Sequence, residues 1–151
     1  ERYFEDYPVG SGGEYGPIAV DETEVLDFAR RFDPQPIHVD PAAALAGPYG
    51  GLIASGWHTC ALMMRVLAEQ FLSPFSSLGS PGIDELRWLR PVRPGDQLTL
   101  RTVVTEARRS RSKPDRGLIR TRVELVNQGG EVVLSLLAMN LIRLRPQIPP
   151  D

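Results

Sequence analysis

A carboxylate and an imidazole stand five residues apart in the segment Asp33-Pro34-Gln35-Pro36-Ile37-His38. At neutral pH an unperturbed aspartate is ionised and an unperturbed histidine is mostly neutral, so this pair can move protons. To share one water, both side chains must come within about 3 Å of it, although five extended residues can span roughly 17 Å. The segment must therefore curl. Each proline fixes its own φ and disfavours the α region for the residue before it, so we expect a stiff, non-helical curl.

Each of the two residues also has a simpler interpretation when it is considered alone. An aspartate before a proline commonly forms an Asx-type turn, and Asp33 could do no more than end the preceding helix. His38 lies between two aliphatic residues, where a histidine is more often a hydrogen-bonded structural group than a catalyst. Considered alone, neither residue therefore favours a catalytic role over a structural one.

Helices are predicted on both sides of this segment. Asp21 as a cap, with Glu24 three residues later and an apolar face behind it, predicts a helix over about 23–31. An aspartate cap, Pro41 at the first helical position and Gly47 as a stop predict a second, short helix. The first helix therefore delivers the chain directly to Asp33.

A third, longer helix is predicted from Gly56 to about Leu72, because this run is apolar around most of its circumference. Its polar residues His58, Arg65 and Glu69 recur at spacings of seven and four, which places them in one narrow stripe. We expect that stripe to be the only wet edge of an otherwise buried helix.

Beyond Pro81 the apolar residues alternate, which predicts antiparallel strands over about 83–90, 97–109, 118–126 and 132–144. The last strand is apolar on both faces over its first half, so we expect it to be central, with a second layer or a partner chain outside it. Before the helices, residues 3–17 predict a short strand or a turn-rich arm. One long helix followed by long antiparallel strands indicates an α+β domain whose sheet wraps the helix.

The composition predicts one domain over 1–145, followed by a proline-rich tail over 146–151. A formal net charge of −2 argues against nucleic acid or an anionic membrane as the main partner. The single cysteine, Cys60, cannot form an internal disulfide, and the chain has no apolar run long enough to cross a bilayer. We therefore expect a cytoplasmic protein that binds neither nucleic acid nor membranes.

The chain resembles the MaoC-like, or (R)-specific enoyl-CoA hydratase, branch of the hotdog fold. The hydratase motif of that family is approximately Gly-Asp-x-Asn-Pro-(Leu/Ile)-His followed shortly by Asp, and residues 32–40 match it with Phe32 in place of Gly and Gln35 in place of Asn. The resemblance continues through the glycine-bearing segment 51–56 and the segment 90–96 between two predicted strands. It covers nearly the whole chain.

This resemblance implies reversible addition of water to a trans-2-enoyl-CoA thioester, giving a 3-hydroxyacyl-CoA. Asp33 and His38 would hold the water, and the resemblance leaves open which of them is the acid and which the base. The Gly56 backbone N–H, at the positive end of the long helix, would be the oxyanion hole. The resemblance implies a homodimer or a larger assembly of dimers, no metal, and no cofactor other than the coenzyme A of the substrate.

Residues around the start of the long helix are further candidates for substrate binding: Gly51, Ser55, Trp57 and His58. The basic cluster over 108–116 is another, because guanidinium groups such as Arg111 and Arg116 bind phosphate and could meet coenzyme A. A solvated hairpin tip is an equal alternative for that cluster.

One departure from the family concerns a serine that in some hydratases lies two turns into the long helix and hydrogen-bonds the catalytic aspartate. The corresponding position in this chain is close to Met64, and Thr59 is a possible substitute. Two other functions therefore stay open: a hotdog acyl-CoA thioesterase, and a non-catalytic acyl-CoA-binding subunit.

Overall fold

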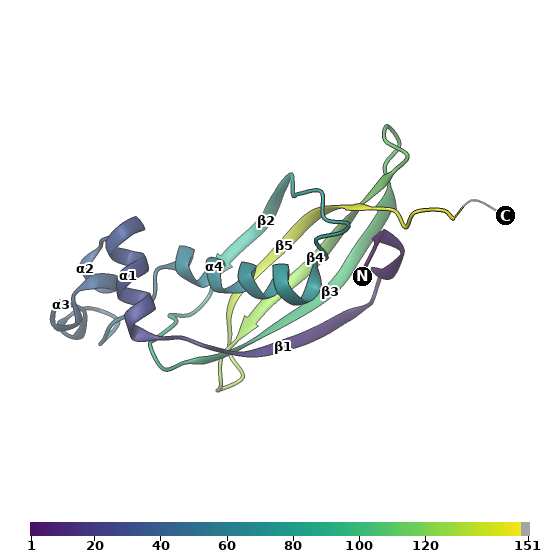
Figure 1. Ribbon diagram of the computed structural model, residues 1–151. Coiled ribbons are helices and arrows are strands. Elements are labelled where there is room, and N and C mark those ends of the chain that lie inside the picture. The colour runs from purple at the N-terminus through teal and green to yellow at the C-terminus, as the bar shows by residue number, and fades with distance from the viewer. Residues whose placement is uncertain (149–151) are drawn as a thin grey trace.

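The alternating segments of the second half of the chain pair with an N-terminal strand into one curved antiparallel sheet (Figure 1). The structure is a computed structural model that describes residues 1–148. The five strands lie in the order β1-β3-β4-β5-β2. Their bounds are Gly12–Ala19 for β1, Gly82–Trp88 for β2, Gln97–Arg109 for β3, Arg116–Val126 for β4 and Val132–Arg143 for β5.

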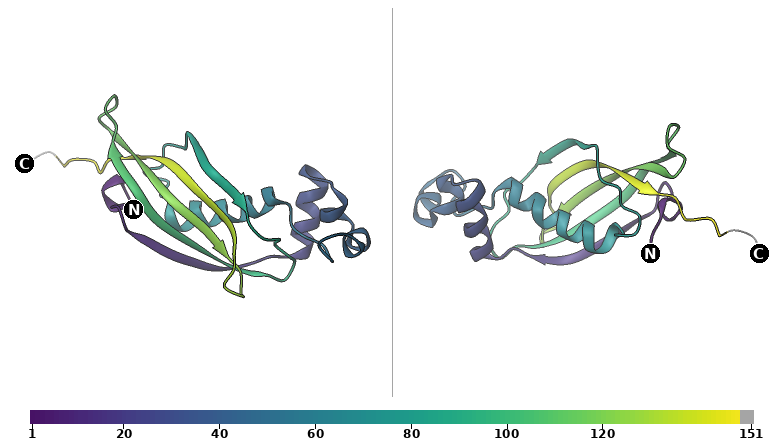
Figure 2. Two further views of the ribbon diagram at one scale, coloured as in Figure 1. Left: turned by 180° about the vertical axis from the view of Figure 1, so that it is seen from behind. Right: turned by 45° about the horizontal axis from the view of Figure 1, so that its top comes forward.

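The long helix α4, Gly56–Val66, lies along the concave face of this sheet, and a π-helical turn over Leu67–Phe71 extends it (Figure 2). Leu62, Met63 and Val66 on the inner side of α4 belong to the same buried core as the inward-facing residues of the strands. Alternation decides which strand residues face inward: Ile119, Thr121, Val123 and Leu125 of β4 are all fully buried. The α+β architecture, with a sheet wrapped around a central helix, is confirmed.

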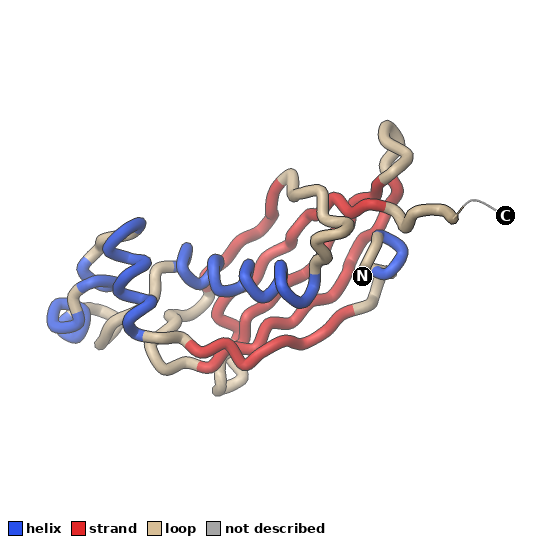
Figure 3. Tube along the Cα trace, in the orientation of Figure 1, coloured by secondary structure: helices blue, strands red, loops and turns tan. Residues whose placement is uncertain are grey.

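Three further helices gather at one end of the sheet, next to the first turn of α4 (Figure 3). They are α1 over Glu22–Phe32, α2 over Pro36–Val39 and α3 over Pro41–Ala46. Asp21 caps α1 by accepting the Glu24 N–H at 3.0 Å, and Asp40 caps α3 by accepting the Ala43 N–H at 3.1 Å. The predictions for α1 and α3 are therefore confirmed to within one residue at each end. A short 3₁₀ turn, η1 over Phe4–Asp6, precedes β1.

The prediction of a non-helical curl is correct for Asp33 to Gln35 and wrong for the residues that follow. Gln35 is extended, with φ −78° and ψ 145°, as a residue before proline should be. Pro36 then occupies the first position of a helical turn, where its fixed φ fits the helix and its missing N–H is not needed. This turn rotates His38 back toward Asp33.

Two predictions about the sheet are refined by the structure. The N-terminal segment contains a full edge strand, β1, paired antiparallel to β3. The last strand, β5, lies inside the sheet between β4 and β2, and its consecutive residues Val133 and Leu134 are both fully buried. Within residues 1–148, no helix covers the outer face of β5, and the middle strand of the sheet is β4.

The chain continues past β5 without helix or strand over 144–148. The predicted tail runs to residue 151, so its last three residues, 149–151, lie outside the described part of the chain, and the proposed domain boundary stays a prediction. No helix within 1–148 is long and apolar enough to cross a membrane.

Candidate active site

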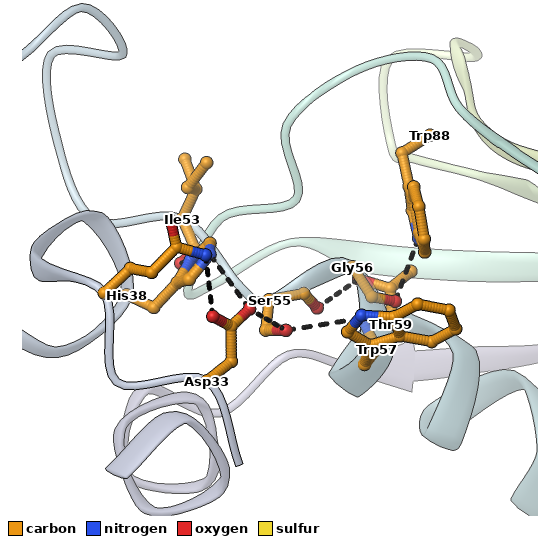
Figure 4. A network of polar contacts seen from close by, with 9 residues as sticks. Asp33, His38, Ile53, Ser55, Gly56, Trp57, Thr59 and Trp88 are labelled. Atoms are coloured by element: carbon orange, nitrogen blue, oxygen red, sulfur yellow. Dashed lines mark hydrogen bonds and ion pairs between the residues drawn. The ribbon is translucent and has the colours of Figure 1, made fainter.

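Asp33 is held at the end of α1 by two side-chain hydrogen bonds, one to each carboxylate oxygen (Figure 4). Gln35 donates to Oδ1 at 2.7 Å, and the Ser55 hydroxyl donates to Oδ2 at 2.7 Å. Donors to the ionised form lower the pKa of Asp33, and the Ser55 hydroxyl contributes most, followed by the Gln35 amide. Asp33 is therefore a carboxylate at neutral pH.

His38 is buried, and one hydrogen bond fixes the orientation of its ring. Its Nδ1 lies 2.8 Å from the carbonyl oxygen of Ile53. A carbonyl oxygen only accepts, so Nδ1 carries a proton and donates it. In the neutral imidazole the other nitrogen, Nε2, then has its lone pair available. That nitrogen faces Asp33, with 3.4 Å between Nε2 and Oδ2. With a neutral imidazole, Asp33 Oδ2 and His38 Nε2 are therefore two proton acceptors side by side.

The first turn of α4 begins directly beside this pair. Ser55 is the N-cap of α4, and its hydroxyl accepts the Trp57 N–H at 3.3 Å. The N–H of Gly56, the first residue of the helix, has no hydrogen-bond acceptor among residues 1–148. Because this donor sits at the positive end of the helix, it is suited to stabilise negative charge on a bound group.

Trp88, at the end of β2, explains why residue 56 is a glycine. A Cβ built on Gly56 would lie 2.4 Å from the indole Cε2 of Trp88, a distance that no real side chain tolerates. The indole Nε1 also donates to the Gly56 carbonyl oxygen at 2.9 Å. The indole therefore fills the space that a side chain at residue 56 would need, while Gly56 still borders the cleft described next.

These groups line a cleft of about 420 Å³ at the end of the sheet. Asp33, His38 and Gly56 all border it. Its other walls are mostly apolar or aromatic, and they come from Ile37, Tyr49, Ile53, Ala54, Trp57, Thr59, Trp88, Leu89, Arg90, Pro91 and Val92. A mainly apolar cleft with a few converging polar groups is the usual form of a small-molecule site.

The structure separates the four substrate-binding candidates at the start of α4. Trp57 lines the cleft, with its ring edge-to-face against Trp88 at a centroid distance of 5.0 Å. Ser55 is completely buried behind Asp33 and does not reach the cleft. Gly51 is half-buried beside the Arg93 guanidinium, also outside the cleft.

His58 points away from the site, and its predicted place on a wet edge of the helix is wrong. It is 5% exposed and stacks on the Phe28 ring of α1 at a centroid distance of 5.0 Å. It borders a separate groove between α1 and α4, and burial lowers its pKa. The prediction is wrong at His58 because α1 packs against α4 there. It is correct for Arg65 and Glu69, which are exposed.

The basic cluster lies in the hairpin between β3 and β4, at the far end of the sheet from the first turn of α4 (Figure 1). Arg116 pairs with Asp115 at 2.9 Å, and Arg111 is exposed near the tip. Neither residue borders the cleft formed by this chain. A role for them in binding coenzyme A stays a prediction.

Two residues of the site have roles that sequence reasoning missed. Ser55 supplies the hydroxyl on Asp33 that the resemblance placed near Met64, and Met64 is 44% exposed on another face of α4. Thr59 borders the cleft but donates to the Ser55 carbonyl oxygen, not to Asp33. Trp88 was also missed, and its only signal was an aromatic residue shortly before the Arg90-Pro91 turn.

Within residues 1–148, no three histidine, cysteine, aspartate or glutamate side chains converge in a way that could hold a metal ion. The absence of a metal requirement stays a prediction.

Comparison with known proteins decides the family of this chain. A family model described as a MaoC-like domain matches residues 9–127. The chain belongs to the MaoC-like domain family. Among solved structures, the MaoC-like dehydratase of Rhodospirillum rubrum is 38% identical, with a TM-score of 0.89, and the match covers 97% of this chain and all of that one. A similar structure from Mycobacterium tuberculosis, 21% identical with a TM-score of 0.77, is described as a double hotdog fold, and this chain has the hotdog fold.

Relatives of the MaoC-like chain include proteins named for hydration and dehydration. The R-hydratase PhaJ1 of Pseudomonas aeruginosa is 27% identical with a TM-score of 0.76, and the match covers 99% of this chain and 94% of that one. The 3-hydroxyacyl-thioester dehydratase Z of Mycobacterium tuberculosis is 34% identical over 88 residues, 57% of this chain and 58% of that protein. The family of this chain therefore includes hydratases and dehydratases.

Proposed function

We propose that this MaoC-like protein is a hydro-lyase that adds water reversibly to a trans-2-enoyl-CoA, giving a 3-hydroxyacyl-CoA. One observation carries the proposal: two proton acceptors 3.4 Å apart, Asp33 Oδ2 and His38 Nε2, share a cleft with the unpartnered N–H of Gly56. Hydration of an enoyl thioester needs both a group that deprotonates water and a donor for the thioester oxygen.

The first step concerns the water. A water molecule beside Asp33 and His38 donates one hydrogen to each acceptor, which aims its oxygen lone pairs into the cleft. As the oxygen bonds to the β-carbon, one of the two residues takes the proton. The electrons of the double bond move toward the thioester carbonyl, forming an enolate. The same proton then adds to the α-carbon, so one water is consumed and nothing else is gained or lost.

The second step concerns the enolate charge. The Gly56 N–H at the start of α4 donates to the thioester oxygen, where negative charge develops. The donor is already in place in the protein, so it does not need to reorganise during the reaction. Hydration causes no net oxidation or reduction, so we expect no cofactor beyond the coenzyme A of the substrate. We also expect this enzyme to be cytoplasmic.

Loss of enoyl-thioester absorbance tests this function directly. With crotonyl-CoA and with a branched trans-2-enoyl-CoA, we expect the purified protein to remove the absorbance of the conjugated thioester, with kcat/KM above about 10⁴ M⁻¹s⁻¹ for a good substrate. A thiol reagent in a parallel assay should detect no release of coenzyme A.

The same assays distinguish the two other candidate functions. Thiol release from a saturated acyl-CoA, without consumption of the enoyl group, would identify a thioesterase and refute the hydratase proposal. Binding of acyl-CoA without either reaction would identify a non-catalytic subunit. A panel of enoyl-CoA chain lengths then defines the substrate.

The proposal also includes a homodimer, in which a second copy of the chain packs against α4 and β2. Apolar side chains remain exposed along one side of α4 and the neighbouring edge strand β2: Trp57, Met64, Ile83 and Trp88 are 57%, 44%, 46% and 45% exposed. The outer edge of β2 has no partner strand within residues 1–148. An unpaired edge and a contiguous apolar surface are both typical of an interface between subunits.

Ile83→Arg tests the dimer. We expect the wild type to sediment at twice the mass of the chain, and the variant to sediment as a monomer, because a guanidinium would be buried without a partner. Val103→Arg is the matched control, since Val103 is a strand residue that is 45% exposed on β3, away from this edge. A dimeric Ile83→Arg protein, or a monomeric wild type, would contradict the assignment of this surface.

A further inference from the structure

The hydroxyl of Ser55 links the Asp33 carboxylate to the first turn of α4, which carries the Gly56 N–H. It donates to Asp33 Oδ2 at 2.7 Å and accepts the Trp57 N–H at 3.3 Å (Figure 4). A serine hydroxyl has one proton, and here that proton is directed to the carboxylate while a lone pair receives the helix N–H. The side chain is completely buried, so no solvent competes for either bond.

The Ser55 backbone is anchored as firmly as its side chain. Its carbonyl oxygen accepts from His58 N at 3.0 Å, Thr59 N at 3.1 Å and the Thr59 hydroxyl at 3.4 Å. These bonds tie Ser55 to the first turn of α4, and the next residue is Gly56. The distance between the Asp33 carboxylate and the Gly56 N–H is therefore controlled through one side chain.

We propose that Ser55 is the positioning residue of this site: its hydroxyl sets the Asp33 carboxylate in register with the first turn of α4 and thus with the Gly56 N–H. The inference rests on the proposed hydration of enoyl thioesters, in which both groups act on one substrate. Ser55 itself touches no substrate, because it does not border the cleft. In some hydratases of the family the serine that bonds the catalytic aspartate lies near the position of Met64, which in this chain is exposed.

The bond also has an electrostatic consequence. Ser55 is the largest of the influences that lower the pKa of Asp33. Removing the hydroxyl destabilises the carboxylate relative to the neutral acid, so the pKa of Asp33 rises. Hydration requires ionised Asp33 and is lost as the pH falls through that pKa. The acid limb of the pH–rate profile therefore moves to higher pH when the hydroxyl is absent.

Ser55→Ala is the first test, measured on the full chain with a trans-2-enoyl-CoA. We expect kcat to fall roughly tenfold or more, the rate equivalent of one hydrogen bond to a charged group. KM should change less than twofold, since Ser55 does not border the cleft. The acid limb of kcat/KM should shift upward, and Ser55→Thr, which keeps a hydroxyl and a helix cap, should restore it.

Ser73→Ala is a closely matched control. Ser73 is also buried, its hydroxyl accepts the Phe75 N–H at the same 3.3 Å, and its carbonyl accepts from Ser76 and Ser77. No carboxylate accepts a hydrogen bond from Ser73 within residues 1–148. A comparable loss of thermal stability in both alanine variants, with the pH shift only in Ser55→Ala, separates positioning from capping.

Carbon-13 NMR titration of the Asp33 carboxyl gives a readout that does not depend on turnover. The proposal expects the pKa of Asp33 to be higher in Ser55→Ala than in the wild type and in Ser73→Ala. A wild type without hydratase activity would refute the proposed function, and this titration would still measure the contact between Ser55 and Asp33. An unshifted titration or an unshifted acid limb, or equal effects of the two alanine variants on kcat, would overturn the inference.

Discussion

Asp33→Asn lowers kcat for enoyl-thioester hydration by roughly 10²- to 10⁴-fold, the usual contribution of a general acid or base, while the protein keeps its fold. The amide has nearly the shape of the carboxylate but has no negative charge and cannot take a proton from water. Its NH₂ group also faces a hydroxyl or amide that donates to Asp33 in the wild type, from Ser55 or Gln35. Stopped-flow or steady-state absorbance of an enoyl-CoA measures the loss, and circular dichroism checks the fold.

Asp40→Asn provides the matched control in the same segment. Asp40 caps α3 by accepting the Ala43 N–H and does not border the cleft. Asparagine caps a helix as well as aspartate does, so we expect activity and stability close to the wild type. Equal loss of activity in Asp40→Asn and Asp33→Asn would mean that the segment is only structurally sensitive. Wild-type activity in Asp33→Asn would refute the role of Asp33.

His38→Gln should impair the reaction to a similar degree, because in the proposed mechanism His38 and Asp33, 3.4 Å apart, hold one water between them. The effects of residues that act as a unit are strongly non-additive, so the double variant Asp33→Asn/His38→Gln should be little worse than either single variant.

The pH dependence of the wild type follows from Asp33. Because its pKa is lowered, we expect the acid limb of activity to lie below the usual range for an aspartate. Activity is present above that pKa and is lost as the pH falls through it.

Local pattern was enough to predict most of the fold. The alternation of apolar residues located the strands, as the buried face of β4 illustrates, and the capping aspartates located α1 and α3. These signals are short-range and depend on few neighbours. The direction of His58 could not be predicted, because it depends on α1 packing across α4, a contact between elements that have no fixed relation in the sequence.

The contacts of the candidate site are likewise of two kinds, local contacts that the sequence predicts and long-range contacts that it does not. Asp33 and His38 lie within six consecutive residues, so their pairing needs only one local turn, and the motif revealed it. The contacts of Ser55 with Asp33 and of Trp88 with Gly56 span 22 and 32 residues. Such contacts follow from tertiary packing. The spacing of residues in the sequence does not reveal them, and the resemblance indicated only that the serine of some hydratases is replaced in this chain near Met64.

Gly56→Ala lowers kcat/KM by roughly 10²- to 10³-fold, the magnitude of losing one oxyanion donor. The added methyl would stand 2.4 Å from the Trp88 Cε2 and 2.6 Å from its Nε1, so the indole or the first turn of α4 must shift. Either movement breaks the bond from the indole N–H to the Gly56 carbonyl and displaces the adjacent N–H from the thioester oxygen. Alanine is the better helix former, so the loss of activity does not require a loss of stability.

A double-mutant cycle with Trp88→Ala distinguishes this steric account from a general disturbance. Without the indole, the methyl has room, so Gly56→Ala should cost several-fold less in the Trp88→Ala background than in the wild type. Gly47→Ala is the control glycine, because its nearest contacts would be at 3.4 Å and its φ is −89°. If the two substitutions are additive in kcat/KM, the indole does not hold Gly56 in place, and the oxyanion donor is oriented by the Ser55 cap alone.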